Sequence, residues 1–327
     1  MAPDVVRALI AAALRRSDVS DSNAASVAEA LTAAELAGQT GHGLRRVEAY
    51  AAQARAGKVK GHAEPTLKAT RPGALAVDAA HGFAYPALDL AIERLPDAAR
   101  ANGIAMAGIR RSHHCGVAGV TVERLANQGL MALMFANAPA AIAPWGGRVP
   151  LFGTDPIAFA APVEGGDPVV VDVSLSKVAR GKLMAAKQKG EAIPEGWALS
   201  PDGSPTTDPA TGMAGTMVPM GDAKGATLAI MVEMLCAGLT RANYAHEATS
   251  FFDAEGDPPG VGQLLIAIDP EAFGPGAAAR FAVLAEAIEG VDGARLPGRR
   301  RQALREEYER GGIPVDRDLV RRIELVG

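Results

Sequence analysis

From about residue 74 onward, short apolar runs alternate with longer stretches of helical periodicity. Each run is bounded by Gly, Pro or Asp, a pattern typical of buried strands. The runs are Ala74–Val77, Ile104–Ile109, Leu130–Phe135, Ile157–Ala161, Val169–Val173 and Leu264–Ile268. The helix-like stretches are Tyr85–Ala101, Val117–Gln128, Ser176–Lys189 and Ala223–Leu239. This alternation predicts an α/β domain over residues 74–270, built on a mostly buried mixed sheet.

The two ends of the chain have a different residue pattern, which is typical of helices. Residues 1–73 are predicted to form a helical segment, because three amphipathic stretches occur there, at residues 4–17, 22–38 and 44–56. Asp21 or Ser22 is expected to cap the second helix. Residues 271–327 are predicted as a C-terminal helical segment. Residues 190–222 are rich in Pro, Gly, Asp and Thr and are expected to form a long loop.

Composition excludes several classes of protein. Lys and Arg total 33 against 37 Asp and Glu, a net charge of −4, and only 4% of residues are aromatic. A nucleic-acid-binding protein normally has a basic excess. The two cysteines, Cys115 and Cys236, cannot build a disulfide framework or a four-cysteine zinc site, and they fit a reducing cytoplasm. No signal-peptide pattern or membrane-length apolar run occurs, so we expect a cytoplasmic protein without membrane or nucleic-acid partners.

Common catalytic fingerprints are missing from the sequence. There is no P-loop, no G-x-S-x-G, no H-E-x-x-H and no C-x-x-C. The nearest match to a Rossmann glycine fingerprint is Gly274–Ala279, which does not follow a predicted strand and reads as the start of a helix. A nicotinamide enzyme on a Rossmann domain is therefore excluded.

The stretch Gly41–Tyr50 is the first candidate site. His42 lies between two glycines, so a substrate can approach its ring, and imidazole exchanges protons near neutral pH. Arg46 follows four residues later and can hold a carboxylate through two parallel hydrogen bonds. On spacing alone, a helix connector with a capping histidine and a solvated arginine fits slightly better.

The second candidate is Arg111–Gly119, a turn of small residues between a predicted strand and helix. Its backbone N–H groups can face an anion. His113 and His114 are adjacent, but neighbours rarely point the same way and no carboxylate is near. We therefore predict no metal site, and a phosphate-facing turn with one functional histidine.

Weaker candidates lie at other turns. Asp172–Ser174 can bind ribose hydroxyls or cap a helix, and the basic side chains that follow can bind an anion or be solvated. Lys224 opens an apolar helix against its dipole, which hints at an anionic ligand. The basic loop Arg295–Arg301 can bind phosphate or be solvated.

In order along the chain, these segments resemble the type 2 malate/L-lactate dehydrogenase family, from about residue 5 to residue 310. The combination is His-Gly-x-x-Arg, Ser-x-His-x-Gly, Pro-Trp-Gly-Gly, Gly-Thr-Asp-Pro, Asp-x-Ser-x-Ser, Lys-Gly and Leu-Pro-Gly. The resemblance implies a homodimeric NAD(P)-dependent oxidoreductase with a non-Rossmann nucleotide domain, the sulfolactate/malate dehydrogenase-like fold.

The resemblance also implies roles for individual residues. His42 matches the family's proton donor, with His114 as the competing candidate, and Arg46 matches the arginine that binds the substrate carboxylate. Thr154 matches a substrate-contacting threonine. The matched cofactor contacts are His114, Cys115, Gly116, Val117, Ala118, Asp172, Val173, Ser174, Lys224, Arg299 and Arg300.

Two departures from the family pattern favour a 2-hydroxy acid over a cyclic imine. The family usually has Ser before the proton donor, where this chain has Gly41, and imine-reducing members usually have a histidine where it has Arg180. The stretches Ser112–Gly119 and Ser174–Lys182 look most like the (2R)-3-sulfolactate dehydrogenase branch. Arg45 or Arg180 is then the candidate for the sulfonate.

We therefore expect hydride transfer between NADP or NAD and a small 2-oxo acid, with imidazolium at His42 giving its proton to the carbonyl oxygen. The basic stretch Arg299–Arg301 favours NADP, because a 2′-phosphate binds arginine. Two alternatives stay open: a reductase of cyclic imine carboxylates, and a non-catalytic nucleotide-binding protein.

Overall fold

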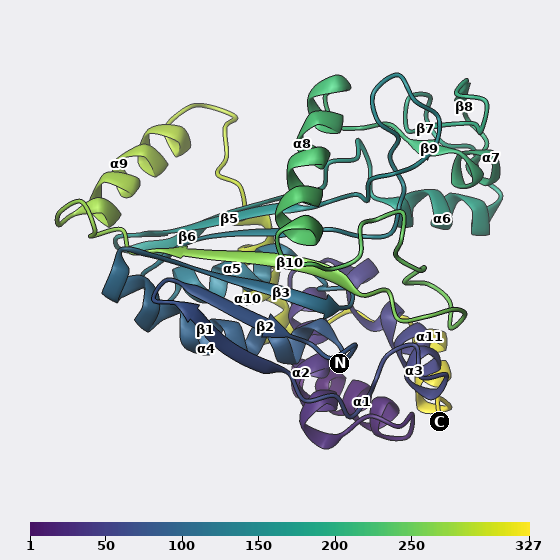
Figure 1. Ribbon diagram of the computed structural model, residues 1–327, viewed down its shortest axis with the longest axis horizontal. Coiled ribbons are helices and arrows are strands. Elements are labelled where there is room, and N and C mark those ends of the chain that lie inside the picture. Colours follow the sequence, from purple (N-terminus) through teal and green to yellow (C-terminus); the bar gives the residue numbers. More distant parts are fainter.

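A computed structural model describes residues 1–327, and a mixed sheet lies at its centre (Figure 1). The strand order is β1-β2-β3-β10-β4-β5-β6, with β2 and β3 parallel and the other neighbours antiparallel. The strands are β1 Thr66–Arg71, β2 Ala74–Asp78, β3 Ile104–Ser112, β4 Met131–Ala136, β5 Ile157–Val163, β6 Gly166–Val173 and β10 Val261–Ile268. The predicted α/β class with a mixed sheet is confirmed. β1 was not predicted, because its sequence TLKATR is mostly exposed and lacks an apolar run.

One face of the sheet is covered by helices along its inner strands. Helices α4 (Ala84–Asn102) and α5 (Ala118–Ala126) pack on it and bury the largest core cluster. The other face is covered only in part by α8 (Ala223–Glu233) and by the π-helical turn Met234–Gly238 that continues it. Along β3, for example, Ile104 and Met106 stay 47% and 37% exposed. The prediction of a mostly buried sheet is wrong for this face, although its strands are apolar on both sides.

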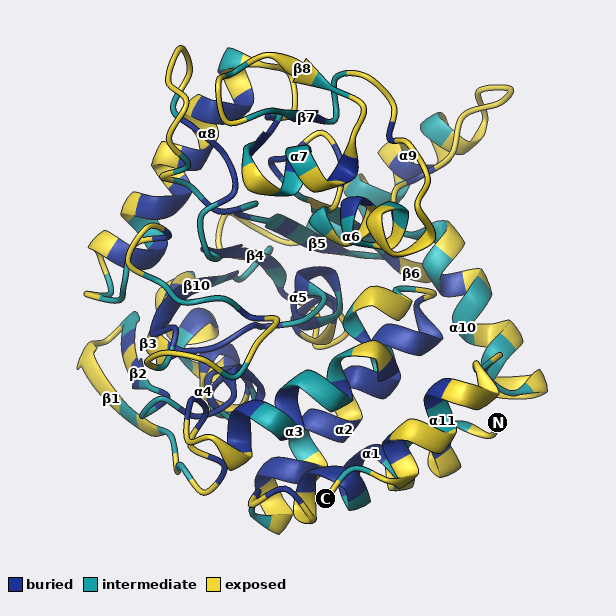
Figure 2. Ribbon diagram, turned by 90° about the vertical axis from the view of Figure 1, so that its right-hand side faces the viewer, coloured by how far each residue is buried: buried dark blue, intermediate teal, exposed yellow.

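The first helices form a second core with the last one. These are α1 (Pro3–Arg15), α2 (Asp21–Leu36), α3 (Val47–Arg55) and α11 (Arg317–Glu324), seen together in Figure 2. The N-cap of α2 is Ser20, whose Oγ accepts from the Asn23 N–H, and not Asp21 or Ser22 as predicted. The Met1 ammonium donates to the Ile313 carbonyl at 2.7 Å. The predicted boundaries at residues 73 and 270 stay predictions, and the sheet already begins at β1.

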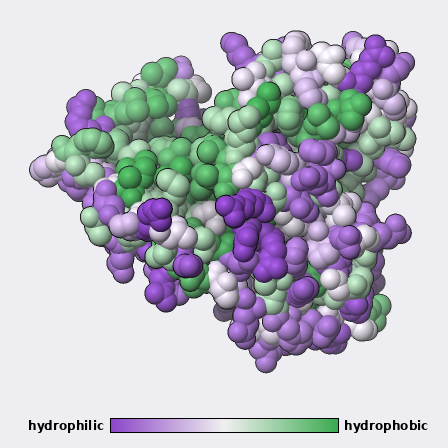
Figure 3. All heavy atoms as spheres, viewed as in Figure 1, coloured by the Kyte–Doolittle hydropathy of each residue, from purple (hydrophilic) through white to green (hydrophobic).

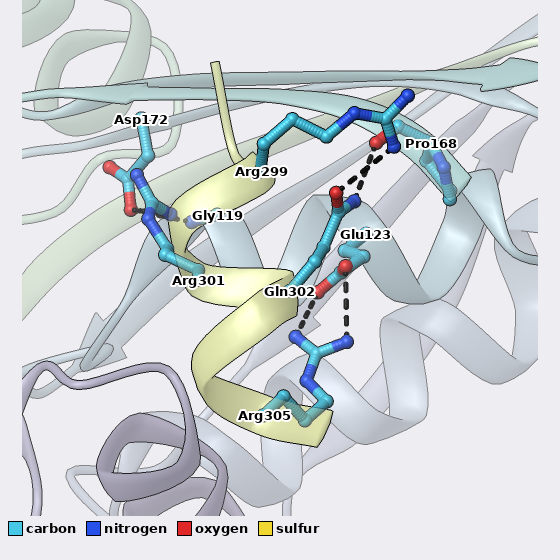
Figure 4. A network of polar contacts seen from close by, with 8 residues as sticks. All are labelled: Gly119, Glu123, Pro168, Asp172, Arg299, Arg301, Gln302 and Arg305. Carbon is cyan, nitrogen blue, oxygen red and sulfur yellow. Dashed lines mark hydrogen bonds and ion pairs between the residues drawn. The ribbon is translucent and has the colours of Figure 1, made fainter. Parts of the chain in front are cut away.

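Two further helices follow β10. Gly274–Gly276 leads into α9 (Ala277–Glu289), as expected for a helix start, and α9 extends away from the rest of the chain (Figure 1). Helix α10 (Arg299–Gly311) then returns along α5 and β6. Arg305 makes a bidentate ion pair with Glu123, and the Gln302 amide donates to the Pro168 carbonyl (Figure 4).

Residues 190–222 are not one long loop. They hold a small sheet and a helix, which share a core with residues 141–142 and with the segment 178–183: β7 (Ala198–Leu199), β8 (Pro205–Thr206), α7 (Pro209–Ala214) and β9 (Thr216–Met217). Strands of two residues are too short to show a hydrophobic period. No helix of the chain is both long and apolar enough to span a membrane.

The predicted helix over Ser176–Lys189 begins only at Arg180, as α6 (Arg180–Lys189). The Ser174 hydroxyl accepts from the Ser176 N–H, and the Ser176 hydroxyl donates to the Val178 carbonyl. These side-chain hydrogen bonds hold the preceding residues in a turn, since serine hydroxyls compete with helical backbone bonds.

Candidate active site

The stretch that carries His42 consists of two short 3₁₀ turns, Thr40–His42 and Leu44–Arg46, between α2 and α3. The buried carboxylate of Glu35 holds it, because its Oε1 accepts from the Leu44 N–H at 2.7 Å. Gly43 is needed there, since a Cβ would lie 2.2 Å from the same oxygen. Gly41 faces open space instead. Only Gly41 therefore leaves the room beside His42 that the sequence suggested for both glycines.

His42 and His114 meet directly. Their Nδ1 and Nε2 atoms lie 3.1 Å apart, and the rings stack with centroids 5.1 Å apart and an interplanar angle of 12°. On its other side, His114 Nδ1 lies 2.5 Å from the Tyr50 hydroxyl, which is itself 3.0 Å from the Tyr85 hydroxyl. His42 Nε2 has no partner within the chain. A row of hydrogen bonds thus leads from the core to a ring nitrogen that is free to meet a ligand.

Arg46 lies beside this row with one nitrogen unsatisfied. Its Nε donates to the Gly41 carbonyl at 2.9 Å, and its guanidinium lies 4.7 Å above the centre of the Phe252 ring. Its Nη1 is buried and has no hydrogen-bond partner. A buried charged donor without a partner is costly. The arrangement therefore suits an incoming anion.

The loop before β10 covers the side chains of His113 and His114. Phe251 packs on both His113 and His114, with centroids 5.2 and 5.4 Å away. Lys58 holds the loop: its fully buried ammonium bonds the Asp253 carboxylate at 2.9 Å and the Asp253 carbonyl at 3.1 Å.

The histidines are neutral at pH 7 in this structure. Burial, with the nearby Arg46 charge adding to it, lowers the pKa of His42 to about 4 and that of His113 to about 3, and it lowers the pKa of His114 well below its usual value. His42 is therefore a neutral imidazole here and not the expected imidazolium. An anion bound at Arg46 offsets the arginine charge and raises this pKa.

The turn before α5 offers unused donors. None of the backbone N–H groups of Gly116, Val117 and Ala118 donates a hydrogen bond within the chain. The next N–H, of Gly119, donates to Asp172 at 3.0 Å, and Arg301 pairs with the same carboxylate oxygen at 3.2 Å (Figure 4). Asp172 thus caps α5 itself. The donors left for a cofactor are the three preceding N–H groups.

Two of the four arginines in the stretch Arg295–Arg301, Arg299 and Arg301, form ion pairs. Arg299 pairs with Glu289 at 2.7 Å and lies in the first turn of α10, so it is not a free loop residue. Arg300 and Lys224, by contrast, are exposed and form no ion pair. The Ser174 hydroxyl, another predicted contact, bonds the Thr154 carbonyl and Ser176, and Cys115 is buried and Val173 exposed.

The three remaining predicted substrate contacts differ in their surroundings. Arg180 is half-buried, and its only hydrogen bond goes to the Ala140 carbonyl at 3.1 Å. Burial lowers the pKa of its guanidinium. Arg45 is exposed and its charge acts on Glu35 and Asp316. The Thr154 side chain makes no hydrogen bond. No group of three or more His, Cys, Asp or Glu side chains is placed to hold a metal ion.

Sequence reasoning missed the residues that surround the histidines. Tyr50, Tyr85, Lys58, Phe251 and Phe252 were given no role. For Tyr50 a pattern was available, since it follows His42 and Arg46 at intervals of four residues, which places all three on one side of a helical path. The others are brought in by folding from distant parts of the chain.

Comparison with known proteins identifies the family. The family model described as malate/L-lactate dehydrogenase matches residues 1–324. This chain belongs to that family. It is thus an NAD(P)-dependent oxidoreductase, as the resemblance implied.

Individual relatives cover nearly the whole chain. The (2R)-3-sulfolactate dehydrogenase (NADP(+)) of Chromohalobacter salexigens is 52% identical over 91% of this chain and 90% of its own. A Δ(1)-pyrroline-2-carboxylate/Δ(1)-piperideine-2-carboxylate reductase of Pseudomonas putida is 39% identical over 98% and 95%. The crystal structure of the Δ1-piperideine-2-carboxylate reductase of Pseudomonas syringae covers 100% of this chain and 99% of that one, with a TM-score of 0.95 and 36% identity.

The lowered histidine pKa values predict a loss of stability in acid. Unfolded histidines take up protons below a pH of about 6.5, whereas His113 in the folded state does so only near pH 3. The unfolded state binds more protons between these values, so stability falls as the pH falls. From pH 7 to pH 5 the free energy of unfolding should drop by about 2 kcal/mol per buried histidine.

Urea unfolding of His113→Phe at both pH values checks this. The ring nitrogens of His113 have no partner, and the site is aromatic, so phenylalanine should fold there. The variant should lose about 2 kcal/mol less than the parent between pH 7 and pH 5. His246→Phe, at an exposed position, serves as the control. An equal acid-induced loss in parent and His113→Phe would contradict the assignment.

Proposed function

We propose that the chain catalyses the reversible NADP-dependent oxidation of a 2-hydroxy acid that carries a second anionic group, of the 3-sulfolactate type. The observation that carries the proposal is the buried, unpartnered Nη1 of Arg46 beside the His42–His114 pair. It provides a cation for a carboxylate next to a group that exchanges protons. The 52% identity to an NADP(+)-dependent sulfolactate dehydrogenase supports the choice of substrate and cofactor.

Each residue then has a defined task. Arg46 binds the carboxylate and aligns the adjacent carbonyl, and Thr154 orients the rest of the substrate. His42 Nε2 holds the proton that goes to the carbonyl oxygen in reduction and receives it in oxidation. The bound carboxylate compensates the Arg46 charge, which makes a proton on His42 easier to hold. Arg180, half-buried and without an acidic partner, is proposed for the sulfonate in preference to the exposed Arg45.

The cofactor is proposed to lie along the turn before α5. The free N–H groups of Gly116, Val117 and Ala118 fit its polar groups, and Lys224 and Arg300 are unpaired cations for its phosphates. When bound, a nicotinamide supplies the hydride. Asp172 and Arg299 are proposed to support this region indirectly, since each is engaged in an ion pair.

A homodimer is proposed on the basis of the open sheet face. Figure 3 shows apolar atoms gathered over α9, this face and α8. The exposed apolar side chains of this surface include Ile104, Met106, Ile230, Met231, Met234, Val283 and Leu284. A contiguous apolar surface of this extent marks an interface. A reducing cytoplasm is proposed as its location, because Cys115 and Cys236 are both buried and unpaired.

The second candidate is reduction of a cyclic imine carboxylate, which the relatives at 34–40% identity favour. NADPH oxidation with sulfopyruvate, oxaloacetate and piperideine-2-carboxylate separates the two. We expect the highest kcat/KM with sulfopyruvate. A higher kcat/KM with the imine would replace the proposed function by this one.

Arg46→Lys tests the carboxylate site. Lysine keeps the charge but loses the planar pair of donors, so alignment of the carbonyl should suffer. A lost charge-assisted hydrogen bond is worth about 1.5–3 kcal/mol, so kcat/KM should fall roughly ten- to a hundredfold for any 2-oxo acid. NADPH affinity, measured by fluorescence, should not change. Arg55→Lys, at the end of the following helix α3 and bonded to Ser17, is the control. Parent-like kinetics in both Arg46→Lys and Arg46→Ala would contradict the proposed carboxylate site.

Arg180→Ala tests the second anion site. Only a substrate with two anionic groups has a second charge to satisfy, so kcat/KM for sulfopyruvate should fall roughly tenfold or more, and that for pyruvate much less. Lys187→Ala, an exposed change on the same helix, should alter neither. Equal losses on both substrates would assign Arg180 to the cofactor or to stability.

Met234→Asp tests the dimer. Met234 is 64% exposed at the end of α8, and a carboxylate there is not compatible with burial against a second copy. Light scattering coupled to size exclusion should show the mass falling from twice 33.6 kDa to 33.6 kDa. Leu325→Asp, 82% exposed on the opposite helical layer, should leave the dimer intact. A monomeric parent would refute the proposal.

A further inference from the structure

A cavity of about 440 Å³ is lined by residues of α2, α4, α5 and α10 and of the turn before α5. Tyr85 and Cys115 line its inner end. The rest of its wall combines apolar with charged residues, and the charged side chains of Glu29, Asp89 and Arg124 are 65%, 41% and 47% exposed. Polar groups line part of the cavity and it reaches solvent, so it can hold water molecules.

Tyr85 joins this cavity to the reaction site. Its hydroxyl lies 3.0 Å from that of Tyr50, which is 2.5 Å from His114 Nδ1, and His114 Nε2 is 3.1 Å from His42 Nδ1. Tyr50 is fully buried and Tyr85 is 5% exposed. Neither hydroxyl has another partner in the chain. Four groups that exchange protons thus connect the cavity to His42 Nε2 without a gap.

Counting protons shows what this row can do. At pH 7 both histidines are neutral and both tyrosines protonated, because burial lowers the histidine pKa values and raises those of the tyrosines. Four groups then hold one mobile proton each, and the three hydrogen bonds between them use three. The fourth proton then lies at one end of the row. It is either on His42 Nε2, when each group donates toward His42, or on the Tyr85 hydroxyl, which then points away from Tyr50.

We propose that Tyr50 and Tyr85 complete a proton relay through which the reaction site exchanges protons with water in the α2/α4/α5/α10 cavity. This inference rests on the proposed function. Neither tyrosine touches the substrate, so both act through His114.

The relay balances the reaction in both directions. In reduction, His42 Nε2 gives its proton to the carbonyl oxygen, and His42 Nδ1 takes one from His114 Nε2. His114 Nδ1 then takes the Tyr50 proton, Tyr50 takes that of Tyr85, and Tyr85 takes one from water. One proton enters from the cavity and one leaves to the substrate. The row ends with His42 Nε2 unprotonated, which is the form that oxidation requires, and oxidation reverses every step.

Protons that travel along this row do not pass through the bound substrate. Closure of an active site excludes water from the reacting atoms while hydride transfer occurs. The ionisable groups that face the relay are Arg46, Lys58, His113 and Cys115 and, around the cavity, Glu29, Asp89, Glu123, Arg124, Arg305 and Glu309.

The test compares Tyr85→Phe with Tyr308→Phe, whose hydroxyl makes no hydrogen bond in the chain. Tyr85→Phe keeps the ring but breaks the row, so kcat for the oxo acid should fall roughly tenfold or more, within the range of general acid catalysis, while KM changes little. The solvent deuterium isotope effect on kcat should rise, because proton delivery becomes limiting. Tyr308→Phe should match the parent. An unchanged kcat and isotope effect in Tyr85→Phe would overturn the relay.

Two further measurements keep the test independent of folding and of the substrate. Ala33→Leu fills the cavity without removing a hydrogen bond, and it should also lower kcat and raise the isotope effect.

In the ligand-free protein, ¹⁵N NMR should show a shifted His114 Nδ1 signal in Tyr50→Phe but not in Tyr308→Phe. An unshifted signal would contradict the hydrogen bond on which the relay depends. If the parent reduces no oxo acid yet this signal shifts, the proposed function has failed and the hydrogen-bonded row has not.

Discussion

The ion pair between Lys58 and Asp253 holds the site together. It joins the end of the N-terminal helical layer to the loop before β10, which is far away in the sequence. The Lys58 ammonium is fully buried, and breaking a buried pair leaves an uncompensated charge, so the loop has little freedom to leave. Through it, Phe251 is pressed on the histidines and Phe252 on Arg46. The catalytic region is thus defined by a contact that takes no part in the chemistry.

Charge is distributed unevenly around that contact. Arg46 and the half-buried Arg180 lack carboxylate partners, whereas other arginines such as Arg301 and Arg305 are paired. The histidines beside Arg46 stay neutral. An unliganded site of this kind attracts anions and resists its own protonation. Binding and proton supply are therefore coupled, because the substrate carboxylate removes the repulsion that keeps His42 neutral.

Much of the fold, and the family, could be predicted from the sequence for physical reasons. Apolar runs predicted the sheet strands of the core, since burial on at least one face requires them, and the combination of motifs predicted the family. β1 and the small sheet after residue 190 were missed, because exposed or very short strands carry no hydrophobic period. Pairings between distant residues were also inaccessible: the partners of Asp172 are defined only once α10 lies on α5 (Figure 4).

The core shared by α1, α2, α3 and α11 has a consequence for biosynthesis. The helices on either side of His42 and Arg46 leave the ribosome first, yet Ile313, Leu319 and Ile323, which complete their core, leave it last. The central sheet strand β10 is also made after its neighbours β3 and β4. The nascent chain therefore exposes apolar helices throughout translation, and its catalytic centre matures only after release. Chaperones that shield hydrophobic nascent segments have their natural point of action in this interval.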